Sequence, residues 1–477
     1  MIPVMVGFLV LALASPALGQ SEASTHFEQQ LSAIFAQKGL TSVDASQRAV
    51  ASSYDLRGRH EQVLAARTAV RQAFLGFLPR LTLIGRYSRK SPVTPSITGR
   101  IVVARNAADG PLPTGTTLVQ VPIDSFPFGV PVDEYFGVAS INIPLTDYIW
   151  KLTQTYQAAQ HNEHAIQLSA VAERLKVARD ARILYYSWVD SKLKLVAAEQ
   201  ALENVRGQAT DVGRFFDVGR ASQADVANLK GRAASAELVI QKIRDLVTAT
   251  EQELRTAMHL SAEQIMLVGE DVRQMPNLPP GLDNIGSLYE EAVQQRLELR
   301  SMNAIREAVK SQASASRGGM LPRIEATGSA IYANPNPRYF PSEPVFRGTW
   351  EIGVQLSWSP NDVANAFMSG RSFDARAREL ETQEASFRDV LRTAVTRAWL
   401  SFRQSLTAVE TAKSEMEAAE EAYCVRQAMF QVGRATSVEL IDAETSLTRA
   451  RIELINACIG TRISLVELLY IIGRDVA

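Results

Sequence analysis

The amino-acid sequence has few of the residues and motifs that mark enzymes or disulfide-stabilised domains. Only two of its 477 residues are cysteines, Cys424 and Cys458, so free thiols are expected rather than a disulfide framework. Five histidines are scattered along the chain, and no glycine-rich phosphate loop, zinc-protease motif or paired-cysteine motif occurs. His161 and His164 lie three residues apart without a further ligand, and are interpreted as solvated. We therefore expect no catalytic centre, metal or cofactor.

An excess of charge and a long apolar run are also lacking. The formal net charge is −1, which excludes a strong electrostatic attraction to nucleic acid or anionic lipid. No run reaches 18 apolar residues, so no membrane-spanning helix is predicted. The shorter apolar run at residues 4–13 is followed by Pro16 and by small residues suited to cleavage, which predicts a signal peptide over 1–19. An exported chain without a spanning helix is periplasmic, secreted or an outer-membrane β-barrel protein.

Proline is missing from residues 145–275 and 361–477, although the chain has twenty prolines. Proline in a helix interior costs about 3 kcal/mol, so long stretches without it that are rich in Ala, Glu, Arg and Leu favour helices. We expect one long helix from Asp147 to about Val212 and a second from Asp362 to about Phe430. Each would be ~100 Å long at the rise of an α-helix.

A second helix is predicted after each long one, with a tight turn between them. Apolar residues at alternating spacings of three and four predict the seam of an antiparallel coiled coil in each copy. In the first copy they are Val226, Leu229, Ala233, Ala236, Ile240, Ile243, Val247 and Leu254. In the second copy they are Leu440, Ala443, Leu447, Ala450, Leu454 and Ala457. Gly219 and Gly433 suit the left-handed position that ends a helix. Ser222 with Asp225, and Thr436 with Glu439, have capping-box spacing. Each pair of helices is thus a hairpin with a glycine at its tip.

The chain repeats one unit of a little over 200 residues. Val218-Gly219-Arg220-Ala221-Ser222 returns 214 residues later as Val432-Gly433-Arg434-Ala435-Thr436. Leu78-Pro79-Arg80-Leu81 returns 243 residues later as Leu321-Pro322-Arg323-Ile324. The change in offset places an insertion in the first copy, after Pro79. Matched segments in one order indicate a duplication.

Short strands are predicted in the proline-rich segments. Four stretches alternate between apolar and polar residues, at about 80–90, 135–145, 323–332 and 350–358. Trp350 and Trp358 frame the clearest alternation, as expected for a strand whose apolar side faces lipid between aromatic girdles. Residues 90–134 and 333–349 are expected to be loops. Four strands cannot close a barrel, and an open sheet edge cannot exist in lipid, so several copies must share one barrel. These arguments leave three and four copies open.

The duplicated order of strand pair and long helical hairpin, together with the string from Val432 to Ala443, resembles the TolC family of outer-membrane efflux and secretion channels. The resemblance implies a mixed, mainly α fold in a homotrimer, with a twelve-stranded outer-membrane β-barrel continuous with a periplasmic α-helical coiled-coil barrel. It also implies a passive exit duct that works with a periplasmic adaptor protein and an inner-membrane pump, carries no enzymatic activity and binds no nucleic acid.

The same resemblance gives a domain plan. Residues 20–50 would form an N-terminal equatorial segment, 51–254 repeat 1, 255–300 an equatorial linker, and 301–477 repeat 2 with a C-terminal equatorial helix. The two tips would be at 218–222 and 432–436.

The resemblance further implies roles for residues at the tips. Glu439 and Asp442 match acids that line the narrow periplasmic aperture, where repulsion between copies is expected to raise their pKa values. Asp225 matches an acid that helps to hold the aperture closed. Adaptor docking would involve the two tips, that is Val218, Gly219, Arg220, Val432, Gly433 and Arg434. Phe430 lacks the hydroxyl of the tyrosine found there in relatives, so the closing contacts are left open.

Plainer interpretations exist for each of these residues. Glu439 and Asp225 are sufficiently explained as capping acids, and Asp442 as a solvated charge. The glycines are turn residues first, and the two tryptophans could belong to a soluble core. The competing function is a periplasmic coiled-coil scaffold without a pore, in which the strands form a small soluble sheet.

Overall fold

The computed structural model describes residues 22–93, 98–104, 111, 113–124, 131–219, 221–261, 263–340 and 342–475. The predicted signal peptide and Arg220 lie outside the described residues. The chain divides into two compact units, one of Met1–Val63, Ala165–Met302 and Thr382–Ala477, the other of Leu64–His164 and Asn303–Glu381. Both units combine segments from the two sequence repeats, as expected for a duplicated chain.

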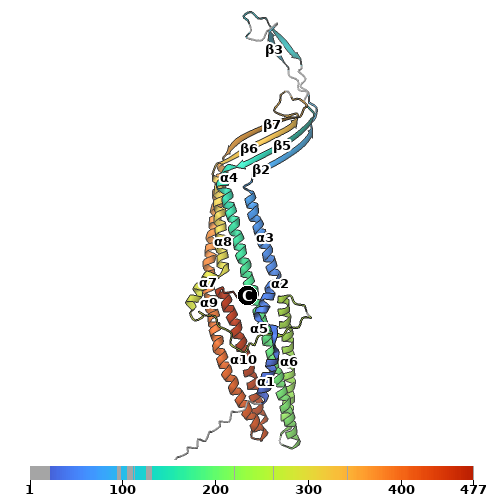
Figure 1. Ribbon diagram of the computed structural model, residues 1–477, viewed down its shortest axis with the longest axis vertical. Coiled ribbons are helices and arrows are strands. Elements are labelled where there is room, and N and C mark those ends of the chain that lie inside the picture. Colours follow the sequence, from blue (N-terminus) through green and yellow to red (C-terminus); the bar gives the residue numbers. More distant parts are fainter. Residues whose placement is uncertain are drawn as a thin grey trace, which may run out of the picture. The chain divides into compact units, whose positions relative to one another are not determined.

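The second unit holds a four-stranded antiparallel sheet with the order β2-β5-β6-β7 (Figure 1). The strands are β2 (Arg80–Arg89), β5 (Asp133–Pro144), β6 (Arg323–Asn334) and β7 (Arg347–Ser357). The central pair β5 and β6 joins the two repeats, with Ser140 opposite Ser329. The helices α3 (Tyr54–Leu75), α4 (Leu145–Ile149) and α8 (Leu297–Arg317) and the short 3₁₀ turn η1 (Gly318–Met320) flank the strands in sequence.

The insertion of the first repeat contains a hairpin that sequence reasoning missed. β3 (Thr98–Ala104) pairs with β4 (Leu118–Asp124) in a separate two-stranded sheet. The expectation of a plain loop over 90–134 was therefore wrong. Its prolines and glycines outweighed two short runs of β-branched residues, in which Ile101 faces Val121 and Val103 faces Val119.

The first unit holds most of two long helical hairpins, whose first helices begin in segments of the second unit. One consists of α5 (Lys151–Asp217) and α6 (Gln223–Met258), the other of α9 (Pro360–Gln431) and α10 (Ser437–Ile472) (Figure 1). The predicted seams are the packed faces, since Leu229, Leu254 and Leu447 are fully buried. By length and composition α10 could cross a membrane, but 56% of its most apolar window is buried inside the protein. We therefore assign α10 as a core helix.

The duplication is visible in matching hydroxyl contacts between the helices of each hairpin. The hydroxyls of Ser191 and Thr250 lie 2.9 Å apart in the first hairpin. Ser405 and Ser464, each 214 residues later, also lie 2.9 Å apart. Because both copies keep this pair, the two hairpins share one packing register.

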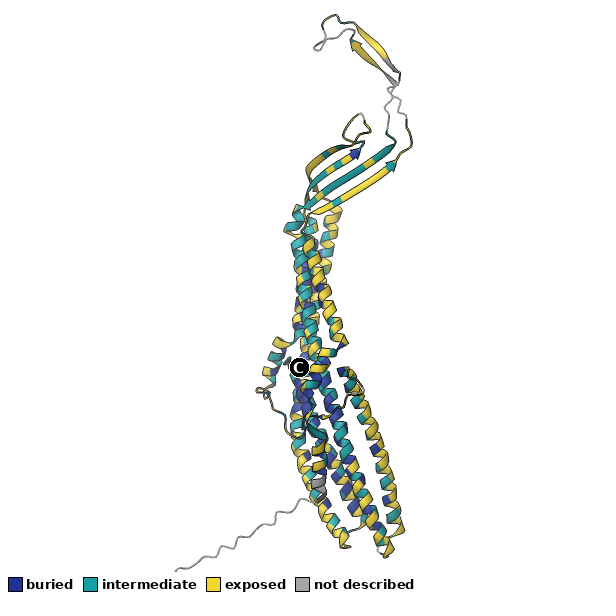
Figure 2. Ribbon diagram, turned by 45° about the vertical axis from the view of Figure 1, so that its right-hand side comes forward, coloured by how far each residue is buried: buried dark blue, intermediate teal, exposed yellow. Residues whose placement is uncertain are grey.

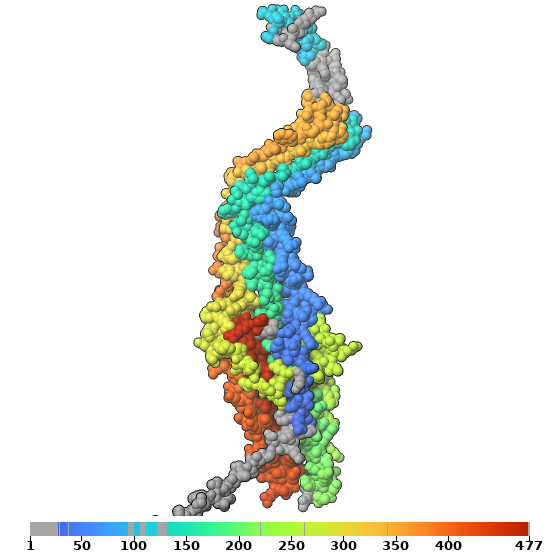
Figure 3. Space-filling model, in the orientation of Figure 1, coloured from blue at the N-terminus to red at the C-terminus, as the bar shows by residue number. Residues whose placement is uncertain are grey.

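A belt of irregular segments surrounds the middle of this unit, where Figure 2 shows many buried residues. Figure 3 shows the N-terminal segment, the linker and the C-terminal end gathered there. They contain α1 (Glu22–Ile34), β1 (Phe35–Leu40), α2 (Ser42–Ser52) and α7 (Ile285–Gln295). One hydrophobic core joins Phe27, Leu31 and Val268 to Tyr185 and Trp188 of α5 and to Ile459 of α10.

Close backbone contacts and one arginine fix this belt. The Leu40 N–H donates to the Leu267 carbonyl at 2.7 Å, and a Cβ at Gly39 would lie 2.4 Å from the backbone of Val268. Glycine is therefore required at position 39. The buried Arg462 of α10 donates to the carbonyls of Val272 and Gln274, at 3.3 and 2.7 Å, and pairs with Glu270.

Candidate functional site

The register of the four-stranded sheet sorts its side chains into two chemically different faces. Residues directly opposite each other in an antiparallel pair project to the same side. One face carries no charged residue between the row of Tyr87 and Tyr135 and the row of Ile324 and Leu356. Besides glycines, and Asn334 beside Tyr135, it consists of Leu81, Leu83, Tyr87, Tyr135, Ala139, Ile141, Ile143, Ile324, Ala326, Ala330, Tyr332, Trp350, Ile352, Val354 and Leu356.

The opposite face carries most of the charged residues of the strands, beside an apolar group of Ile84, Phe136, Val138, Ile331 and Ala333. Arg86 lies 3.7 Å from Glu134, and the Asn142 amide donates to Glu325 at 3.4 Å. Glu351 pairs with Arg338 of the connection between β6 and β7. In the described part of the chain, only Ala333 of these four strands is buried (Figure 2). Neither face of the sheet is therefore covered within one chain.

The two tryptophans singled out in the sequence occupy the apolar side differently. Trp350 lies within β7 on the apolar face and is 71% exposed. Trp358 follows the end of β7, is 59% exposed, and its indole N–H donates to the Met320 carbonyl at 3.4 Å. A soluble-core position is excluded for both within this chain by their exposure.

An aromatic row near the loop end of the sheet was missed by sequence reasoning. The rings of Tyr87 and Tyr135 lie 5.0 Å apart, and Phe346 lies 5.8 Å from Tyr135 and 5.3 Å from Tyr332. The sequence contains a signal for it, because each of the three tyrosines occupies an apolar position in the alternation of its strand. Recognising the row requires the register between strands, which one sequence does not give.

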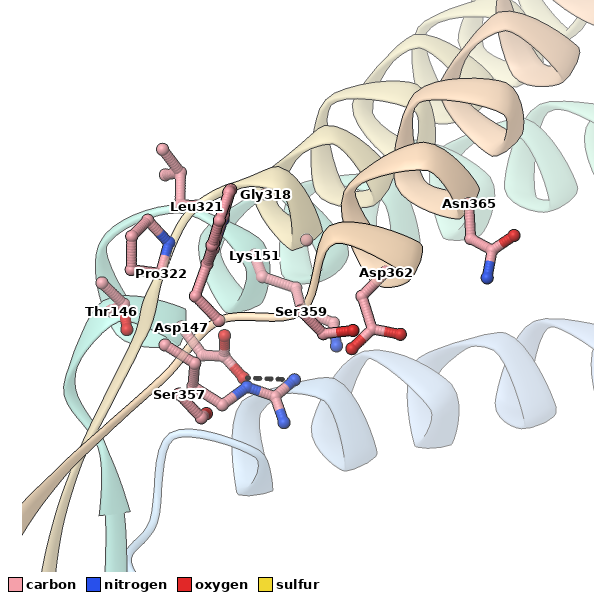
Figure 4. Close-up of a pocket in the computed structure, with 13 residues that line it drawn as sticks. Thr146, Asp147, Lys151, Gly318, Leu321, Pro322, Ser357, Ser359, Asp362 and Asn365 are labelled. Atoms are coloured by element: carbon pink, nitrogen blue, oxygen red, sulfur yellow. Dashed lines mark ion pairs between the residues drawn. The ribbon is translucent and has the colours of Figure 1, made fainter.

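Both outer strands leave a free edge. Among the described residues, β2 pairs only with β5 and β7 only with β6. Where the strands pass into helices, a cavity of about 420 Å³ is lined by polar groups (Figure 4). Arg323 lies 3.8 Å from Asp147 there, and the Ile324 N–H donates to the Thr146 hydroxyl at 2.7 Å. These contacts fix the corner between strand and helix.

The two helical tips have the local geometry that the sequence predicts. Gly219 and Gly433 have φ values of 76° and 75°, which only glycine adopts without strain. Both capping boxes are complete. The Asp225 N–H donates to Ser222 at 3.2 Å and the Glu439 N–H to Thr436 at 3.3 Å. Val218, Val432 and Arg434 are exposed around these turns.

Local hydrogen bonds lower the pKa values of two acids at the tips. Hydrogen bonds from Ser222 and Ser437 lower the pKa of Asp225, and those from Thr436 lower the pKa of Glu439. Within one chain, capping stabilises the Glu439 carboxylate; the rise expected from repulsion between copies stays a prediction. Glu439 also lies 3.5 Å from Arg426. Asp442 lies exposed one turn further along α10.

The structure adds a contact between the two tips. The Ser437 hydroxyl donates to Asp225 at 2.7 Å, 212 residues away in sequence. Ile441, one turn on, packs with Val212 and Leu229. Further along the same stripe of α10, the Asn204 amide donates to Glu444 at 2.8 Å. We call Ser437, Ile441 and Glu444 the inter-hairpin seam, and sequence reasoning identified none of its long-range partners.

These features define a class of protein with a lipid-compatible sheet and long helical hairpins. The chain matches the family of outer membrane efflux proteins over residues 45–258 and 288–474, one segment in each repeat, and it belongs to this family. Its family is thus one of outer-membrane proteins. The duplicated, mainly helical fold class predicted from the sequence is thereby confirmed.

Individual relatives are distant in sequence. The chain is 20% identical over 341 residues to the toluene efflux pump outer membrane protein TtgC of Pseudomonas putida, which covers 69% of this chain and 65% of the relative. The open state of the Neisseria gonorrhoeae MtrE outer membrane channel has a TM-score of 0.70 at 15% identity, covering 91% of this chain and 89% of MtrE. The Campylobacter jejuni CmeC outer membrane channel has a TM-score of 0.69 at 14% identity, covering 99% and 93%.

Proposed function

We propose that three copies of this chain form a passive exit duct across the outer membrane and the periplasm. The observation that carries this proposal is the uniformly apolar face of a sheet that has two free edges. In lipid each edge must find a hydrogen-bonding partner, so β2 of one copy pairs with β7 of the next. Three copies of four strands give a twelve-stranded barrel.

The polar face of the sheet then lines the lumen, and the aromatic row lies at a membrane border. Trp350 and Trp358 contribute to the girdles on the lipid side. The helical hairpins of the three copies continue as a coiled-coil tunnel, because their exposed flanks need partners. Residues 20–50 and 255–300 and the end of α10 form the equatorial belt, and residues 1–19 act as a cleaved signal peptide.

The tips form the periplasmic entrance. Glu439 and Asp442 of each copy line the aperture, and Asp225 takes part in holding it closed through Ser437. A periplasmic adaptor docks on the exposed turns at Val218, Gly219, Val432, Gly433 and Arg434, with Arg220 as a further docking residue, and connects the duct to an inner-membrane pump. The duct itself carries out no catalytic step, so the pump supplies the energy.

The proposal is tested by locating the protein and measuring its pore. Cell fractionation with heat-dependent gel mobility is expected to place a folded barrel in the outer membrane. Purified protein in planar bilayers is expected to give discrete conductance steps. A fully soluble periplasmic product without conductance would instead support the scaffold.

A further inference from the structure

A carboxyl group is buried where the two hairpins meet. Glu444 of α10 is 4% exposed and lies two turns beyond the start of the helix, ~12 Å from the cap at Thr436 by helical rise. Its Oε1 accepts a hydrogen bond from the Asn204 amide of α5 at 2.8 Å, and Gln200 donates to Asn204 at 3.0 Å. Its Oε2 is buried and makes no hydrogen bond of good geometry within the described residues.

The surroundings of Glu444 offer little compensation for a negative charge. On α5, Asn204 and Gln208 are neutral, and both polar atoms of the buried Gln208 side chain lack a well-aligned partner in the described chain. On α9, the buried Tyr423 hydroxyl lies beside Glu444. On α10, Thr448 and Arg451 are its neighbours.

The charged groups nearest to Glu444 contact other residues. Arg451 lies 3.9 Å from Glu420 of α9 and packs its guanidinium 4.2 Å from the Phe27 ring centre. On α6, Arg232 donates to Thr445, the residue after Glu444, at 3.3 Å. An ionised carboxylate with one well-aligned donor, Asn204, costs more to bury than a protonated one.

Burial is the main influence on this group. It raises the pKa of Glu444 above its ordinary value of 4.5, while the Asn204 hydrogen bond, the Arg451 charge and the Tyr423 and Thr448 hydroxyls act in the opposite direction. The free energy of the closed packing therefore depends on whether Glu444 carries a proton.

We propose that Glu444 is a proton-binding site that couples the packing of the two hairpins to pH. Its neighbours in the seam, Ser437 and Ile441, contact α6 and α5, so α10 cannot move away from the first hairpin without exposing Glu444 to water. The proposal rests on the proposed function, because it treats separation of the hairpins as the opening of the entrance.

The direction of the effect follows from linkage. A raised pKa in the closed state means that protonation stabilises closure, fully below pH 4.5, and that this stabilisation is lost as pH rises through the pKa of the closed state. Each pH unit in that window changes the ratio of closed to open by up to about tenfold per copy.

The test is single-channel recording of the full-length protein between pH 4.5 and 8, in a Glu439→Gln, Asp442→Asn background that keeps the aperture acids from titrating. Open probability is expected to rise with pH when Glu444 is present. With Glu444→Gln, which keeps the shape of the neutral acid, the channel is expected to stay mostly closed at every pH. Glu453→Gln, an exposed acid on the same helix, serves as the matched control and is expected to behave like its parent.

A second variant covers the case in which Glu444→Gln does not assemble. Asn204→Ala removes the donor that stabilises the ionised form, so the pH midpoint of opening is expected to move upward. An unchanged pH response with Glu444→Gln, or an unchanged or lower midpoint with Asn204→Ala, would overturn the proposal. Absence of any conductance from the parent protein would instead contradict the proposed function.

Discussion

The Ser437 hydroxyl lies 2.7 Å from an oxygen of Asp225 and joins the tips of the two helical hairpins. Ser437 begins α10, and Asp225 caps the start of α6. The Asp225 carboxylate thus caps α6 after the first hairpin turn and also binds Ser437 at the tip of the second hairpin. Under the proposed function, this contact takes the place of the tyrosine hydroxyl that Phe430 lacks. Phe430 instead packs against Phe215 at 5.5 Å.

Replacing Ser437 by alanine is expected to favour the open entrance. The lost hydrogen bond is partly exposed to solvent, so its removal should cost the closed state about 0.5–1.5 kcal/mol. The measurement is open probability in planar bilayers. Ser446→Ala is the control, because that hydroxyl donates to the Asp442 carbonyl of its own helix. Equal effects of the two substitutions would show that the tip contact does not hold the entrance.

The same contact predicts a second response to pH, opposite in sign to that of Glu444. Asp225 has a lowered pKa in the closed tip because of its hydrogen bonds from Ser222 and Ser437. The Ser222 cap is local to α6, so only the part of the lowering due to Ser437 contributes to closure, and this contribution is lost as pH falls through the lowered pKa. Open probability measured below pH 4 should rise again, and Asp225→Asn should remove that rise.

Any side chain at the tip glycines is expected to lower the free energy of unfolding. At Gly433 a Cβ would meet nothing within 4 Å, so the cost of Gly433→Ala comes from the left-handed backbone alone, about 1–2 kcal/mol. Gly231→Ala, in the interior of α6 and equally open, should instead stabilise the protein by about 1 kcal/mol. Thermal unfolding of the two variants measures the difference. A destabilised Gly231→Ala together with an unaffected Gly433→Ala would reject this explanation of the turn.

How much of this could be predicted from sequence depends on the distance along the chain between the interacting groups. The turns at Gly219 and Gly433 follow from residues within one helical turn, and both capping boxes were predictable. The contact from Ser437 to Asp225, and the bridge from Leu40 to Leu267, join distant segments, and no local pattern reports them. The β3–β4 hairpin was missed because the prolines around it masked a weak strand signal.

The two faces of the sheet predict opposite outcomes for one charge. Ile352→Arg places a cation on the apolar face and should cost about 2–4 kcal/mol of membrane insertion. Gln355→Arg places it on the polar face of the same strand, where it should be tolerated. Outer-membrane fractionation and heat-dependent gel mobility measure both. Equal recovery of both variants in the membrane would contradict the assignment of the lipid face.

The aperture acids predict the ion selectivity of the duct. In the proposed trimer, two carboxylates from each copy, Glu439 and Asp442, would attract cations and bind divalent ions. The double variant Glu439→Gln, Asp442→Asn is expected to lose cation selectivity and block by divalent cations while the pore remains. Reversal potentials in a salt gradient measure this. Unchanged selectivity would leave Glu439 with a capping role alone.

The copy number of the purified protein in detergent tests the central claim most directly. Because β2 and β7 each have an unpaired edge, a stable particle with three times the mass of one chain is expected by light scattering corrected for detergent. A folded, stable particle with the mass of a single chain would contradict the shared barrel and everything built on it.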